Sequence, residues 1–186
     1  MKNLILISML LRSFSLLAQD IDEIYFHSGE VAKVDVKRVN EKTVEYNYPN
    51  ENATLVVSKY AIERIVFRSG RTQEISERYE VHGENDWENV ILLYDPDEAV
   101  GLKKVQDVLG KTKGFFSGYV SAAGSDRRAN EKLLREAAEL KCPFVLLVAD
   151  KDAKGGMQRG SYGSQSIKKG VAYTYEVFTP KTITTK

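Results

Sequence analysis

Short runs of alternating apolar and polar residues, separated by turn residues, fill the chain from residue 20 to residue 72. Alternation with a period of two predicts strands that bury one face. The predicted strands are 24–26, 31–39, 43–48, 55–57 and 64–67, with a helical turn at 58–61 before the last. Because closure of a short sheet removes its unpaired edges, this pattern predicts a small, strongly bent β-barrel over residues 19–72.

The pattern changes in residues 88–178. Apolar residues recur at helical spacing between 129 and 140 and predict an amphipathic helix that begins at Ser125 or Asp126 and ends near Lys141. Further strands are predicted at 90–94, 105–110, 115–120, 144–149 and 171–178. The fold class predicted for the chain is therefore α+β: a small β-barrel module, then an α+β module with one main helix packed on a small sheet. Residues 179–186 form a polar tail.

Two flanking segments complete the predicted organisation. Residues 73–87 hold five carboxylates and one arginine, which predicts an acidic linker. Residues 1–18 combine a basic start, an apolar stretch and a small residue before position 19, the layout of a secretory signal peptide. Arg12 interrupts the stretch before it reaches the roughly 20 apolar residues that a membrane span needs. A buried N-terminal helix is the alternative.

The signal peptide sets the expected location of the protein. It predicts an exported chain, periplasmic or secreted, soluble and not membrane-spanning. The single cysteine lies at position 142, far from the expected cleavage point, so a lipoprotein is not predicted.

The residues also carry two resemblances. Residues 24–31 and 62–70, in this order of short strands, resemble Sm-like and SH3-like small barrels and a β-module found behind signal peptides in exported bacterial proteins of unknown function. Residues 108–110, 129–140 and 142–147 resemble a heavy-metal-binding domain family and the related domain of an envelope-stress sensor lipoprotein. The second resemblance implies a role at the cell envelope and, because domains of this group form rings, self-assembly. A single cysteine cannot make the sensor's disulfides, so its redox behaviour is not implied.

The charge balance argues against a nucleic-acid partner. Sm-like barrels often bind RNA, but residues 19–72 hold 8 basic and 9 acidic side chains. The whole chain has a formal net charge of +1. Sequence-independent binding of phosphates needs a strong basic excess, which is missing in both cases.

Candidate groups for catalysis or metal binding are few. His27 and His82 lack the paired spacing of a metal site. The carboxylates of 95–98 and 150–152 lack the spacing of a calcium loop. Cys142 stands between a predicted helix and a predicted strand, a position that usually faces the core, which opposes a role as a nucleophile. The sequence therefore predicts a protein that is not an enzyme and holds neither a cofactor nor a metal.

The most unusual segment is 151–170, which has five glycines and a net charge of +4. Loops of this length are often functional. Its charge favours contact with an anionic surface or a protein partner, and a solvated hairpin connection is the alternative. The candidate partner-binding residues are Met157, Arg159, Tyr162, Lys168 and Lys169.

These features predict an exported, non-enzymatic binding or sensing protein that acts at the bacterial cell envelope through protein–protein contacts. The second module would dock on a partner or add a strand to it. One alternative is a self-assembling, ring-forming structural protein in which edge strands such as 171–178 pair between copies. Another is a protein that binds a cation or a small ligand.

Overall fold

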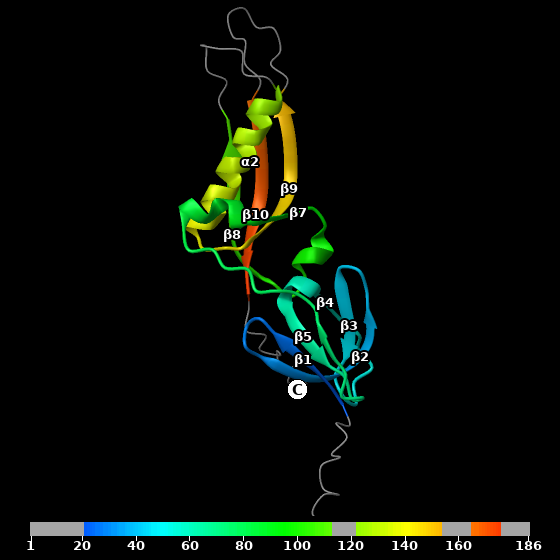
Figure 1. Ribbon diagram of the computed structural model, residues 1–186. Coiled ribbons are helices and arrows are strands. Elements are labelled where there is room, and N and C mark those ends of the chain that lie inside the picture. The colour runs from blue at the N-terminus through cyan, green and yellow to red at the C-terminus, as the bar shows by residue number, and fades with distance from the viewer. Residues whose placement is uncertain (1–20, 113–121, 154–164, 176–186) are drawn as a thin grey trace, which may run out of the picture.

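The computed structural model describes residues 21–112, 122–153 and 165–175. These residues form a six-stranded sheet, a four-stranded sheet and one main helix, which confirms the α+β class. Figure 1 shows the two sheets one above the other, with the helix lying along the four-stranded sheet. Within the described ranges, no helix is long and apolar enough to cross a membrane.

Five strands of the six-stranded sheet follow the predicted alternation closely, and the sixth, β6, was not predicted and overlaps the start of the predicted linker. The strands are β1 (Asp22–Phe26), β2 (Val31–Val39), β3 (Thr43–Asn47), β4 (Leu55–Ser58), β5 (Ile62–Val66) and β6 (Thr72–Glu74). The order across the sheet is β4-β3-β2-β1-β5-β6, and all neighbours are antiparallel. The predicted helical turn is the 3-10 helix η2 (Lys59–Ala61), which begins after Ser58, whose hydroxyl accepts from the Tyr60 N–H.

Backbone pairing leaves this sheet open, in contrast to the predicted barrel. In the described part of the chain β4 and β6 are the two edges, and no ladder joins them. Register shifts at Tyr25/Phe26 and at Val36/Arg38 bend the sheet, because a bulge increases local twist. The sheet therefore curves without closing on itself.

A buried carboxylate fixes the start of β1. Asp22 accepts hydrogen bonds from the N–H groups of Val36, at 3.0 Å, and Arg68, at 2.8 Å. These bonds tie β1 to β2 and to the turn after β5. The concave side of the sheet holds the fully buried residues Ile24, Val34, Val44, Tyr46, Ile62 and Ile65.

The second sheet has the order β7-β9-β10-β8. Its strands are β7 (Ile91–Leu93), β8 (Lys103–Lys111), β9 (Phe144–Ala153) and β10 (Gln165–Thr174). Only β7 and β9 are parallel; the other pairs are antiparallel. The prediction of 171–178 as an edge strand is wrong, because β10 pairs with β9 on one side and β8 on the other. The predicted strand 115–120 lies outside the described residues.

The main helix, α2 (Ala122–Glu139), starts three residues before the predicted cap at Ser125. It packs on the four-stranded sheet through Ala129, Leu133 and Ala137, all fully buried. Its approach is close because Gly110 lies beneath it: a Cβ there would come within 1.9 Å of the Ala129 carbonyl oxygen. The apolar stripe predicted from the sequence is thus the surface that meets the sheet.

The predicted acidic linker is anchored to both modules. We call residues 75–81 the strap. Ser76 donates to the carbonyl of Ile62 at 2.8 Å, and its Oγ lies 2.9 Å from Nε2 of His27. Further along, the Tyr79 N–H donates to the Tyr175 hydroxyl at 2.8 Å. The strap therefore runs from the first module to the second through fixed contacts, although most of its side chains are exposed.

The strap ends in the packing of the second module. Val81 is buried against the core beneath α2, and the 3-10 helix η3 (Glu84–Asn89) follows it. The guanidinium of Arg135 on α2 lies over the Trp87 ring at 5.1 Å. The two sheets also share one hydrophobic core, which includes Ile24, Ile62 and Ala61 of the first module and Leu93, Leu102, Phe144 and Leu146 of the second.

Candidate binding sites

The four-stranded sheet has one face covered by α2 and one face that is only partly covered. Gly110 faces α2, so Leu109 and its cross-strand partner Lys169 point the other way. Near the six-stranded sheet this second face is buried through Phe144. Further along it is open, and Leu109 is 46% exposed. We call this open part the uncovered face.

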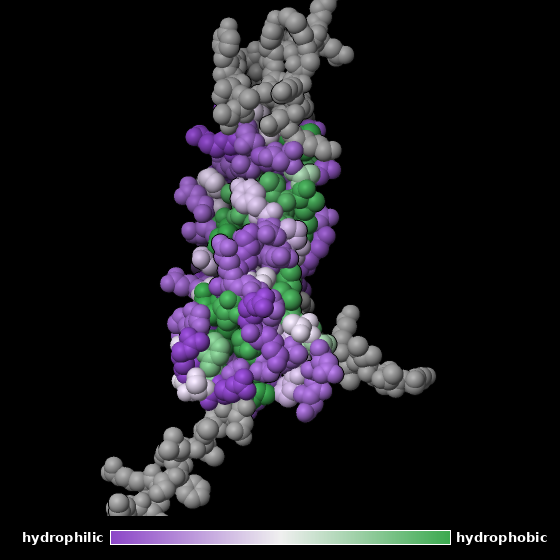
Figure 2. All heavy atoms as spheres, turned by 90° about the vertical axis from the view of Figure 1, so that its right-hand side faces the viewer, coloured by the Kyte–Doolittle hydropathy of each residue, from purple (hydrophilic) through white to green (hydrophobic). Residues whose placement is uncertain are grey.

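Two bulges add exposed valines beside it. In β8, Val105 is the extra residue opposite the Ala172/Tyr173 step, and it is 44% exposed. In β9, Val148 is the extra residue opposite the Lys169/Gly170 step, and it is 63% exposed. Figure 2, viewed from the side on which β9 lies in Figure 1, shows hydrophobic surface among hydrophilic residues in the half that holds this sheet. Bulges commonly redirect side chains in this way.

The outer edge of β8 is partly occupied by side chains of α2. Glu136 accepts from the Leu109 N–H at 2.8 Å, and the Lys132 ammonium donates to the Lys111 carbonyl at 3.1 Å. These are backbone groups that an added strand would need. Such protection disfavours strand addition at this part of the edge. Within the described residues, the uncovered face carries no such protection and is a candidate surface for docking.

The five candidate residues of the Gly-rich segment have different positions. Met157, Arg159 and Tyr162 lie outside the described residues. Lys169 is exposed on the uncovered face. Lys168 points to the opposite side, where its side chain is only 4% exposed and forms ion pairs with Asp126 and Asp150.

Lys168 therefore belongs to a polar network inside the module. Burial lowers its pKa, but the hydrogen bonds to the two carboxylates outweigh burial, so the pKa is raised and the side chain stays charged. Ser166, two residues earlier, donates to Asp126 at 3.3 Å and through its N–H to Thr112 Oγ1 at 3.1 Å. Of the two described candidates, only Lys169 is placed to touch a partner.

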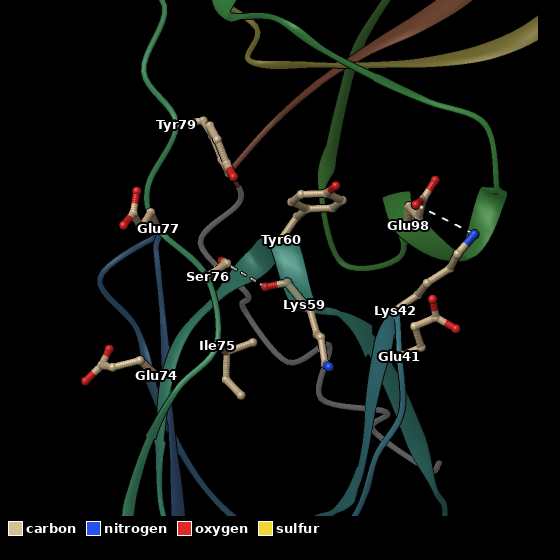
Figure 3. Close-up of a pocket in the computed structure, with 10 residues that line it drawn as sticks. All are labelled: Glu41, Lys42, Lys59, Tyr60, Glu74, Ile75, Ser76, Glu77, Tyr79 and Glu98. Carbon is tan, nitrogen blue, oxygen red and sulfur yellow. Dashed lines mark hydrogen bonds and ion pairs between the residues drawn. The ribbon is translucent and has the colours of Figure 1, made fainter.

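A second candidate site lies where the two sheets meet. It is an open groove with a cavity volume of about 740 Å³. Figure 3 shows side chains of the strap on one side, those of the β2–β3 turn and of the 3-10 helix η4 (Pro96–Ala99) on the other, and η2 between them. The lining residues are Glu41, Lys42, Lys59, Tyr60, Glu74, Ile75, Ser76, Glu77, Tyr79 and Glu98.

Aromatic rings form one wall of the groove. Tyr60 and Tyr79 lie edge to face, with ring centroids 6.2 Å apart. Both rings pack on Phe144, which is fully buried, at 5.2 and 5.9 Å. Tyr175 also contacts Phe144, with ring centroids 5.5 Å apart. This aromatic cluster holds the first module, the strap and the second module together.

The charged groups of the groove are mostly acidic. Four glutamates and two lysines line it. Lys42 is already paired, with Asp95 at 2.9 Å and Glu98 at 3.6 Å. Burial and the nearby negative charge of Glu98 raise the pKa of Tyr60, so this tyrosine stays neutral at physiological pH. The groove therefore combines aromatic faces with an excess of negative charge.

The residues considered for metal binding serve other purposes. Asp95 and Glu98 form a capping box at the start of η4, which accounts for their spacing. His27 is buried next to Tyr175, with centroids 5.1 Å apart, and His82 is exposed in another segment. In the ranges that the structure covers, no three metal-ligating side chains converge.

Cys142 is buried as predicted, with 1% of its surface exposed. Its N–H donates to the Ala137 carbonyl at 3.0 Å, which places it at the end of α2 and against the core. Burial raises the pKa of the Cys142 thiol to about 11. The reactive form, the thiolate, is therefore scarce at neutral pH.

We expect Cys142 to react with a mild aromatic disulfide reagent at least about a hundred times more slowly in the folded chain than in urea, because burial removes both thiolate and access. Release of the coloured thiol, followed at pH 8 with and without urea, measures this ratio. Equal rates in the two conditions would show a reactive thiol and would favour an enzyme over a binding protein.

The groove residues come from four segments far apart in the sequence, and no motif in the sequence marks them. Comparison of the chain with protein families, with curated proteins and with solved structures found no match in any of the three.

Proposed function

We propose that this chain is an exported, non-enzymatic binding protein that acts at the bacterial cell envelope through protein–protein contacts made by the uncovered face. The observation that supports this most strongly is the group of exposed apolar side chains, Val105, Leu109 and Val148, on and beside a sheet face that α2 does not cover. Exposed apolar surface rimmed by polar residues is typical of protein-binding sites. The signal-like layout of residues 1–18 supports export.

The charges around the uncovered face suggest the chemistry of the partner. Lys111 and Lys169 are exposed there, and neither has an ion pair with a carboxylate in the described part of the chain. Lys104 and Asp107 neutralise each other at 2.8 Å. The partner would therefore present an apolar centre with acidic residues at its rim. Docking on the face is favoured over strand addition, because Glu136 and Lys132 occupy backbone groups of the β8 edge.

Site-specific photo-cross-linking in native envelopes tests this proposal. A photoreactive residue at Val148 is expected to capture one identifiable protein, whereas the same residue at Arg128, which is exposed on α2, captures it much less. The captured protein, once purified, is expected to bind the wild-type chain and to bind Leu109→Glu at least about tenfold more weakly, because the new charge opposes burial of the face.

Other outcomes would contradict the proposal. Equal capture from the two positions would indicate non-specific proximity. Capture of only other copies of the chain would favour the ring-forming alternative. Leu109→Glu is a suitable probe because Leu109 is already half exposed, so the exchange has little effect on folding.

A further inference from the structure

We infer that the groove between the two sheets binds a small organic cation, a guanidinium or ammonium group, against Tyr60 and Tyr79. This site is separate from the uncovered face and needs no protein partner. Its cavity volume of about 740 Å³ lies in the range of sites for small molecules, roughly 300–1,000 Å³. Its walls come from fixed elements, η2, η4 and the anchored strap, so the cavity is present before a ligand arrives.

The aromatic wall indicates what kind of group fits. Elsewhere in the described chain, four half-exposed rings carry an arginine of the same chain over their faces, whereas Tyr48, Tyr94 and Tyr173 do not. The pairs are Arg64 over Tyr25 at 3.9 Å, Arg71 over Phe67 at 4.1 Å, Arg78 over Tyr175 at 5.0 Å and Arg135 over Trp87 at 5.1 Å. Among the described residues no such cation covers Tyr60 or Tyr79, although both line the groove. A ligand cation can take this position, since ring faces attract cations.

The charge of the groove lining also favours a cationic ligand. The four glutamates exceed the two lysines by two charges, and the carboxylate of Asp95, which pairs with Lys42, adds a third. In Figure 3, Glu77 lies on the strap next to Tyr79, Glu74 lies further down at the end of β6, and Glu98 lies across the groove from them. The net negative charge of the lining attracts a cation and repels an anion.

A cationic group of this kind can belong to a free small molecule or to a basic side chain of a peptide. Three probes distinguish them by titration calorimetry. Butylguanidine represents the free cation, N-acetylargininamide represents an arginine within a peptide with the same single charge, and N-acetylcitrullinamide has nearly the same shape as the second but carries no charge. We expect at least one cationic probe to bind with a Kd of about 0.1–1 mM and the neutral one to bind at least about tenfold more weakly. The tighter of the two cations identifies the source.

Matched variants locate the site. The double exchange Glu74→Gln/Glu77→Gln is expected to weaken binding about three- to tenfold, because each exposed ion pair contributes a modest attraction. The control Glu51→Gln/Glu88→Gln changes the net charge equally at exposed positions outside the groove and is expected to leave the Kd unchanged. Tyr79→Leu is expected to weaken binding about two- to fivefold. Its backbone bond to Tyr175 does not depend on the side chain.

Three results would overturn the inference. They are no heat of binding with either cation up to about 10 mM, equal affinity for the neutral analogue, or equal weakening by the groove and control pairs. Backbone amide NMR shifts provide a second measurement, and the largest shifts are expected at Tyr60 and Tyr79. Because Leu109→Glu lies on the uncovered face, it is expected to leave this binding unchanged, so failure of one proposal does not carry over to the other.

Discussion

Replacement of Gly110 by alanine is expected to lower the free energy of unfolding by about 3 kcal/mol, at the upper end of the range for overpacked cores. The new methyl group would lie 1.9 Å from the carbonyl oxygen of Ala129 and 3.0 Å from Cβ of Leu133. The Ala129 oxygen belongs to the backbone of α2, so the contact is relieved only if the whole helix moves away from the sheet. Denaturant unfolding followed by circular dichroism measures the loss.

Gly170→Ala is the matched control. Gly170 lies on the neighbouring strand and faces the same helix, but the nearest atom to its added methyl group would be Cγ1 of Val145 at 2.6 Å, with the carbonyl oxygen of Leu146 further away at 3.1 Å. A side chain can adjust more easily than a backbone, so we expect a smaller loss of about 1 kcal/mol. If Gly110→Ala were as stable as the wild type, the close approach of α2 to β8 would be wrong.

Phe144→Ala is expected to lower the free energy of unfolding by about 3–5 kcal/mol, because a fully buried phenylalanine leaves a large cavity. The exchange should mainly weaken the packing between the two sheets, because the Phe144 ring contacts Tyr60, Tyr79 and Tyr175. Fluorescence of Trp87 reports on the second module and far-ultraviolet circular dichroism reports on both. During denaturant unfolding of the wild type, the two signals should change at the same denaturant concentration. In the variant, their midpoints should differ.

Phe144→Leu provides the comparison. Leucine keeps most of the apolar volume but lacks the aromatic contacts, so its loss should be clearly smaller and the two signals should still coincide. Separate transitions already present in the wild type would contradict a core shared by both sheets.

Local pattern was sufficient to predict most elements of this fold. Alternation from Thr43 to Tyr48 marks β3, and the apolar stripe through Ala129 and Leu133 marks the buried side of α2. Both patterns reflect which side of an element is buried, and this can be read from residues that are close together in the sequence.

Pairing between distant segments could not be predicted in this way. Residues 171–174 alternate like an edge strand, yet β10 lies at the centre, because strand order depends on the whole sheet. The predicted closure of the first sheet is wrong for a similar reason, because pairing between β4 and β6 depends on segments far apart in the sequence and not on the alternation within either one. The bulge valines were missed too, because a bulge shows only when two strands are compared.

For the candidate sites too, the sequence predicted local features but not contacts between distant segments. The sequence predicted partner-binding residues in the Gly-rich segment. Of these, Lys169 lies on the uncovered face, whereas Lys168 forms ion pairs inside the module. The groove was not predicted at all. Tyr60 and Tyr79 belong to different segments with no shared motif, and they meet only because both pack on Phe144.

The strap gives this chain a mechanical property. Ser76 fastens it to the first module and Tyr79 fastens it to the second, and the residues between them form one wall of the groove. Tension that pulls the two modules apart is therefore expected to widen the groove, because the strap is bonded to both modules. By reciprocity, a cation held against Tyr60 and Tyr79 would raise the force at which the modules part, so that occupancy of the groove and load on the chain regulate each other.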